Sequence, residues 1–153
     1  MESLRECGLS DGELADLKRM AGFMIPADET FAVPGADDPL IFTDMVSSLG
    51  IDREDVRAAL TCVRALASSP LSDLDDVHAE RLTFQLLAQS GRPIQTLGRV
   101  VLAAYYRDDR VMRSIGREPR APYPKGHTLT DGDWSLLEVV KIRAPIWRDD
   151  RQA

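Results

Sequence analysis

The sequence has few of the residues that build disulfide frameworks and metal centres. It contains two cysteines, Cys7 and Cys62, and two histidines, His78 and His127, among 153 residues. The cysteines lie far apart without a CxxC pair, and the histidines form no HxxxH or HExxH pattern. This spacing predicts neither a disulfide framework nor a zinc site. We expect Cys62 to be a core thiol on an apolar helix face. We expect His78 to lie on a helix surface and His127 to be structural or exposed to solvent.

Catalytic sequence motifs and long apolar runs are also missing. No GxSxG, Walker or dinucleotide-binding pattern occurs. The apolar stretch that starts at Leu97 has about ten residues, whereas a membrane-spanning helix needs roughly 20. The N-terminal residues show neither a basic segment before an apolar run nor a twin arginine, which predicts no secretory signal and a cytoplasmic location. We expect no catalytic residue, no metal and no cofactor in this chain.

The net charge of −6 argues against non-specific binding to nucleic acid or to anionic membranes. The charge is unevenly distributed, since residues 1–104 carry a net −8 and residues 105–153 a net +2. The C-terminal segment is therefore rich in arginine relative to an acidic body. It either pairs with the body of its own chain or faces a partner, because arginine is enriched at interfaces.

Apolar residues recur at helical spacing through most of the chain, which predicts an all-α domain of about six or seven helices in an irregular bundle. Ser10 with Glu13 forms a capping box, and Asp38 with Pro39 is typical of a second helix start. Gly50 is predicted to follow the end of that helix. Residues 25–39 between these helices are predicted to be a loop. The further predicted N-caps are Asp52, Ser72 and Asp108 or Asp109.

The stretch Leu97–Gly116 is the predicted centre of the fold. Its first half is apolar on nearly every side, which predicts a buried helix that begins after Pro93. Tyr105 and Tyr106 cannot face the same way, so one is expected in the core and the other at a polar partner. The charged second half is expected to supply a helix cap and ion pairs rather than a catalytic carboxylate pair.

The C-terminal third combines proline, arginine and tryptophan. Residues 117–127 are expected to be extended. Trp134 and Trp147 bracket Arg143, and this composition is typical of interface anchors. The alternative is that both indoles clamp the segment to its own body. We expect one domain, 1–153, with residues 105–153 wrapping the surface of the remainder.

Three segments together resemble the gluconate 2-dehydrogenase subunit 3 family. They are LADLKRMAGFMIPADETFAVPGADDPLIFTDMV, LGRVVLAAYYRDDRVMRSIGREPRAPYP and GDWSLLEVVKIRAPIWR. The resemblance implies a small, non-catalytic accessory subunit that supports assembly or maturation of an FAD-dependent sugar dehydrogenase of the glucose–methanol–choline type. It places the FAD in the large partner subunit, often with a cytochrome c also present. Such subunits commonly begin with a twin-arginine signal, which this sequence lacks.

Three functions remain open from the sequence. An accessory subunit predicts an exposed, partly apolar patch near 119–147. A small enzyme or ligand-binding protein predicts a cavity where Tyr105, Tyr106, Arg107, Arg113 and Trp134 converge. A self-associating structural or regulatory protein predicts that the C-terminal segment packs on a second copy. The candidate partner-binding residues are Tyr106, Arg107, Arg113, Trp134, Arg143, Trp147 and Arg148.

Overall fold

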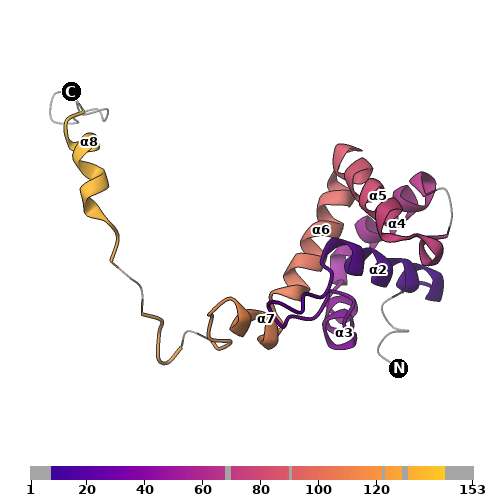
Figure 1. The fold of residues 1–153 in the computed structure, drawn as a ribbon, viewed down its shortest axis with the longest axis horizontal. Helices are drawn as coiled ribbons and strands as arrows, with labels where there is room; N and C mark the ends of the chain where they lie inside the picture. Colours follow the sequence, from indigo (N-terminus) through magenta and orange to yellow (C-terminus); the bar gives the residue numbers. More distant parts are fainter. Residues whose placement is uncertain (1–7, 68–69, 90, 122, 129–130, 144–153) are drawn as a thin grey trace. The chain divides into compact units, whose positions relative to one another are not determined.

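A computed structural model describes residues 8–67, 70–89, 91–121, 123–128 and 131–143 (Figure 1). These residues form seven α-helices and no strand, which confirms the predicted all-α class. The helices are α2 (Asp11–Met24), α3 (Pro39–Ser47), α4 (Arg53–Leu66), α5 (Asp76–Gln89), α6 (Arg92–Tyr105), α7 (Asp109–Ser114) and α8 (Glu138–Lys141). Short 3₁₀ turns lie at Gly50–Asp52, Leu71–Asp73 and Trp134–Leu137. Within the described residues, no helix has the length and apolar character needed to cross a membrane.

The chain divides into two units, Met1–Pro119 and Arg120–Ala153. The first unit contains α2 to α7, and the second contains α8. Residues 105–119 therefore belong to the helical body itself. The packing of the remaining C-terminal residues on that body stays a prediction.

The core of the first unit is built around α6, which packs against α4 and α3 (Figure 1). α2 completes the bundle by contacting both α4 and α5. Each of these helices contributes a stripe of buried aliphatic side chains, as the helical spacing predicts. The buried residues include Leu17, Met20, Ile41, Met45, Leu60, Val63, Leu82, Leu86, Leu97 and Val101.

Three predicted helix starts are confirmed. Ser10 and Glu13 form a reciprocal capping box, in which the Ser10 N–H donates to Glu13 Oε2 at 2.7 Å. Asp38 accepts the N–H of Leu40 at 3.0 Å, with Pro39 in the first turn of α3. Asp108 accepts a backbone N–H at the start of α7 in the same way. These caps satisfy amide groups that a helix N-terminus otherwise leaves unpaired.

The predicted N-caps Asp52 and Ser72 do not cap their helices. Asp52 stands before α4, but its carboxylate makes no capping bond and accepts instead from Arg99 at 2.5 Å. Ser72 lies inside a 3₁₀ turn, and α5 begins only after Asp75. Tertiary packing explains the later start of α5, because burial of Leu71 in this turn and of Leu74 just after it holds the chain out of the helix.

The turn after α3 also differs from its prediction. α3 ends at Ser47, and Gly50 starts the next 3₁₀ turn rather than following the helix cap directly. Gly50 still adopts a positive φ of 47°, a conformation that favours glycine.

The prediction that the central helix is apolar and buried on all sides was wrong. α6 begins at Arg92, with Pro93 in its first turn. Leu102 is 47% exposed and Ala103 is exposed too, because α3 and α4 cover only one side of α6. The prediction that Cys62 is a core thiol was also wrong, because this free thiol is only half-buried.

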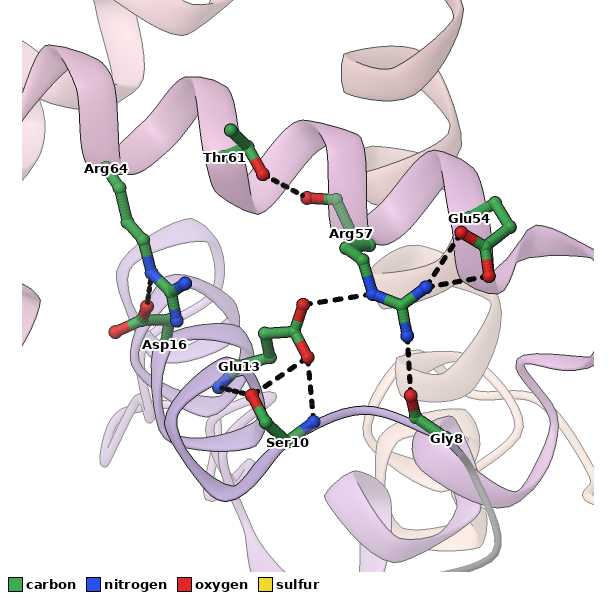
Figure 2. A network of polar contacts seen from close by, with 8 residues as sticks. All are labelled: Gly8, Ser10, Glu13, Asp16, Glu54, Arg57, Thr61 and Arg64. Carbon is green, nitrogen blue, oxygen red and sulfur yellow. Dashed lines mark hydrogen bonds and ion pairs between the residues drawn. The ribbon is translucent and has the colours of Figure 1, made fainter.

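A network of polar contacts ties α2 to α4 (Figure 2). The Arg57 guanidinium donates to Glu13 Oε1 at 3.0 Å, to Glu54 at 2.7 Å and to the Gly8 carbonyl at 2.5 Å. Further along the two helices, two turns after Arg57 and one turn after Glu13, Arg64 pairs with Asp16. The capping glutamate of α2 is thus also the anchor by which α4 holds α2.

Candidate functional site

The predicted partner-binding residues fall into three groups. Tyr106, Arg107 and Arg113 lie in the first unit, at the end of α6 and on α7. Trp134 and Arg143 lie in the second unit. Trp147 and Arg148 lie outside the described residues.

The two adjacent tyrosines face different ways, as predicted, and one of them lies in the core. Tyr105 is buried, whereas Tyr106 is 50% exposed. Their rings meet edge to face, with centroids 5.4 Å apart and an interplanar angle of 81°, a favoured aromatic geometry. Burial raises the pKa of the Tyr105 hydroxyl, with a smaller contribution from the charge of Asp108. The edge-to-face contact thus packs the half-exposed Tyr106 ring against the buried Tyr105 ring.

A hollow of about 600 Å³ lies beside these rings, between the loop after α2, the end of α6 and α7. We call it the Tyr106 hollow. It is lined by Ile25, Pro26, Ala27, Asp28, Phe31, Val33, Tyr105, Tyr106, Val111, Ser114 and Ile115. Phe31 and Ile115 are also exposed. Apart from Asp28 and Ser114, this lining offers apolar and aromatic surface, which suits an apolar side chain of a ligand.

The loop that forms one wall of the hollow is held by specific contacts. Asp28 accepts the N–H groups of Thr30 at 2.7 Å and Phe31 at 3.1 Å, and it pairs through its backbone with Val33. A Cβ atom on Gly35 would lie 2.5 Å from Asp37 Oδ1 and 3.0 Å from the Ala27 nitrogen. The close return of the loop on itself therefore requires glycine at this position.

The outer face of α6 adjoins the hollow through Tyr106, which borders both. We call this surface the α6 face; it consists of Gln95, Gly98, Arg99, Leu102, Ala103 and Tyr106. Leu102 and Tyr106 give it exposed apolar surface, and Gln95 and Arg99 are its exposed polar residues. Sequence reasoning missed Leu102, Phe31 and Ile115 as surface residues, because an apolar residue carries no signal of which neighbours will cover it.

The predicted arginines are already paired within the first unit. Arg107 binds Asp44 at 2.6 Å and also donates to the Ser48 hydroxyl. Arg113 binds Asp109 at 2.8 Å, one turn back on α7. Both arginines thus turn to carboxylates that do not line the Tyr106 hollow. The convergence of Arg107 and Arg113 with the tyrosines on one cavity, which the ligand-binding alternative predicts, is therefore not observed.

Arg110 makes the most elaborate contacts of this region, although the sequence analysis did not select it as a site residue. Its guanidinium binds Asp38 at 2.8 Å and Asp108 at 2.8 Å, which are the N-caps of α3 and α7. Hydrogen bonds from Arg110 hold the pKa of both carboxyls below the usual range. The sequence carries one signal for the Arg110–Asp108 pair, which is an arginine two residues after a predicted N-cap aspartate.

The second unit presents an apolar surface of its own. Asp133 caps the 3₁₀ turn at its start, accepting the Ser135 N–H at 3.0 Å. Trp134 is 72% exposed and Ile142 is 83% exposed. Arg143 is exposed at the end of this segment. Among the described residues of this unit, the large apolar side chains do not bury one another; those exposed are Tyr123, Trp134, Leu136, Leu137, Val139, Val140 and Ile142.

One of the two histidines makes a close contact with a carboxylate. His78 lies exposed on α5, as predicted for a helix-surface histidine, and its Nδ1 lies 2.7 Å from Oδ1 of Asp75 just before the helix. Hydrogen bonds from the backbone and the ring of His78 lower the pKa of Asp75. His127 is also exposed. Among the described residues, no three His, Cys, Asp or Glu side chains are grouped so that they could hold a metal ion.

Comparisons with protein-family models, with curated proteins and with solved structures gave no match for this chain.

Proposed function

We propose that this chain is a non-catalytic accessory subunit that binds a large FAD-dependent sugar dehydrogenase and supports its assembly or maturation. The family in the proposal comes from the resemblance of three sequence segments described above. The observation that carries the binding role is that the large apolar side chains of residues 134–142 are not buried against one another. In this proposal the flavin and the chemistry belong to the partner.

The composition of this segment supports a partner role. Six of its nine residues are large and apolar, and they include an exposed tryptophan. A helix this short is not stable alone in water, so it needs a surface to pack against. Burying each such side chain contributes about 1.5–3 kcal/mol. The segment therefore has the composition of a binding element, with Trp134 as its natural anchor.

The Tyr106 hollow supports the same role from the first unit. It is concave and mostly apolar, and Tyr106 and Phe31 stand exposed at its edge. Aromatic side chains with neighbouring arginines are typical of the centres of protein interfaces. Arg107 and Arg113 adjoin this surface as exposed ion pairs, which exchange partners at small energetic cost.

The proposal is tested by purifying the tagged full chain from its native host at native expression. We expect a yellow eluate with flavin absorbance and a larger protein in roughly stoichiometric amount. Trp134→Ala should reduce the recovered flavin at least about tenfold, as for an interface hot spot. Phe84→Ala is the matched control, because Phe84 is an exposed aromatic residue on α5. A colourless eluate that contains this chain alone would contradict the proposal.

A further inference from the structure

We infer that two copies of this chain associate through the α6 face, in a two-fold contact where Tyr106 of each copy packs over Gly98 of the other. This inference does not depend on the flavoprotein partner. It rests on the spacing, the shape and the charge of one helix face within the first unit.

The α6 face is a single straight seam. Gln95, Leu102 and Tyr106 follow one another at intervals of seven and four residues, which places them on one side of a helix. Leu102 and Tyr106 are both about half exposed, and the cap residue Tyr106 still has helical backbone angles. The main helix contacts of α6 are with α4 and α3, and they leave these two side chains half exposed.

The shape of the seam suits its own copy. Gly98 leaves a notch, since a Cβ atom there would meet only Met24 Cε, at 3.9 Å. Tyr106 lies four residues after Leu102 and Gly98 four residues before it, about 6 Å away in each direction. When two α6 helices pack antiparallel with the two-fold axis at Leu102, each Tyr106 ring therefore falls on the Gly98 notch of the other copy.

The charges along the seam are self-complementary in the same arrangement. Arg99 is paired with Asp52 at 2.5 Å, and Arg107 is paired with Asp44 at 2.6 Å. These two arginines are eight residues apart, about 12 Å along the helix. An antiparallel copy brings the Arg107 pair of one chain beside the Arg99 pair of the other, so each arginine approaches a carboxylate of the second copy. Arg99 on the α6 face and Arg107 just beyond its end are thus both compensated by carboxylates, and two copies meet there without like-charge repulsion.

An isologous contact of this kind closes as a dimer. One helix pair is smaller than the roughly 1,600 Å² of a standard interface, so we expect a dissociation constant of about 10–100 µM. Sedimentation velocity of the reduced full chain, from about 1 µM to about 500 µM, should show a shift from one chain to two. The limiting mass should be twice the 17.0 kDa of one chain.

Two substitutions separate the contact from the fold. Leu102→Asp should abolish the dimer with little change in melting temperature, because Leu102 is half exposed. Gly98→Leu should also abolish it by filling the notch, and it should not lower helix stability since glycine is a poor helix former. Ile51→Asp is the control, as Ile51 is almost fully exposed outside the α6 face. This variant should dimerise like the unchanged chain.

The register has a direct test in a chain with Cys7→Ser and Cys62→Ser. Leu102→Cys should form an intermolecular disulfide under mild oxidation, because the axis brings position 102 against itself. Gln95→Cys, on the same face but away from the axis, should not. A monomer at the highest concentration would overturn the inference. So would a dimer that survives Leu102→Asp and dissociates on Trp134→Ala, since the contact would then belong to the second unit.

Discussion

The double role of Glu13 gives the sharpest test of how the first unit is held together. Its Oε2 accepts the Ser10 N–H at 2.7 Å and the Ser10 hydroxyl at 2.9 Å, while its Oε1 accepts from Arg57 at 3.0 Å (Figure 2). Its side chain is only 14% exposed, so these contacts are shielded better than those of an ordinary surface ion pair. Removing Glu13 should therefore loosen both the start of α2 and its attachment to α4.

The magnitude follows from these contacts. Loss of a helix cap costs about 1 kcal/mol, and loss of one partly shielded, charge-assisted bond costs about 1 kcal/mol more after allowance for solvent. We expect Glu13→Ala to lower the free energy of unfolding by about 2 kcal/mol. Glu13→Gln, which retains a capping side chain, should lower it by about 1 kcal/mol. Urea denaturation followed by circular dichroism measures both differences.

The pH dependence identifies the carboxylate as the cause. The Ser10 backbone hydrogen bond, with help from the Ser10 hydroxyl and Arg57, holds the pKa of Glu13 below its usual value. A carboxyl with a lowered folded-state pKa contributes stability above its unfolded pKa of about 4.3 and loses it as the pH falls through the folded pKa. The difference between the unchanged chain and Glu13→Gln should be full at pH 7 and should vanish near about pH 2.

Glu54 provides the matched control, because it binds the same guanidinium at 2.7 Å but is 75% exposed. Glu54→Gln should change the free energy of unfolding by no more than about 0.5 kcal/mol. The reasoning is refuted if Glu13→Gln and Glu54→Gln have equal effects at pH 7, or if the Glu13→Gln difference persists unchanged at low pH.

The remaining predictions concern α6, the loop and the arginine clamp. Leu97→Ala should cost about 2–5 kcal/mol and Leu102→Ala less than about 0.5 kcal/mol, because only the first side chain is buried; equal effects in urea denaturation would contradict the observed orientation of α6. Gly35→Ala should cost about 1–3 kcal/mol by forcing its Cβ against Asp37, which thermal unfolding would detect. Arg110→Lys should cost about 1 kcal/mol, because a lysine cannot hydrogen-bond Asp38 and Asp108 at once as the planar guanidinium does. The stability of this variant should fall less steeply on acidification than that of the unchanged chain, since the pKa values of Asp38 and Asp108 would no longer be lowered by Arg110.

Local patterns in the sequence predicted most of the elements of this fold. The capping box at Ser10 and the Asp38–Pro39 start are confirmed because their contacts lie within three residues of each other. The prediction that Tyr105 and Tyr106 face different ways, with one in the core, is confirmed for the same reason, since helix geometry alone separates neighbouring side chains. Where the determinant is local, the sequence was sufficient.

The failures have a common cause in contacts between distant segments. Asp52 was predicted to cap α4, but an arginine 47 residues away takes its carboxylate. The outer face of α6 was predicted to be buried, but no apolar pattern states how many helices will surround it. The position of the hollow beside Tyr106 could not be predicted either, since it depends on how the loop after α2 returns to α7. Tertiary packing decides each of these points.

The ion pairs also indicate which force should dominate any contact on the α6 face. Arg99 and Arg107 are both compensated by carboxylates of their own chain, so a second copy exchanges charges with them rather than neutralising free ones. Such an exchange contributes little net energy between exposed groups, which leaves Leu102 and Tyr106 to supply the affinity through burial of apolar surface. The dimer should therefore be insensitive to salt, because screening acts on uncompensated charge. Raising sodium chloride from about 0.1 M to about 0.5 M should change its dissociation constant by less than about threefold, whereas a contact made by free arginines would weaken much more strongly.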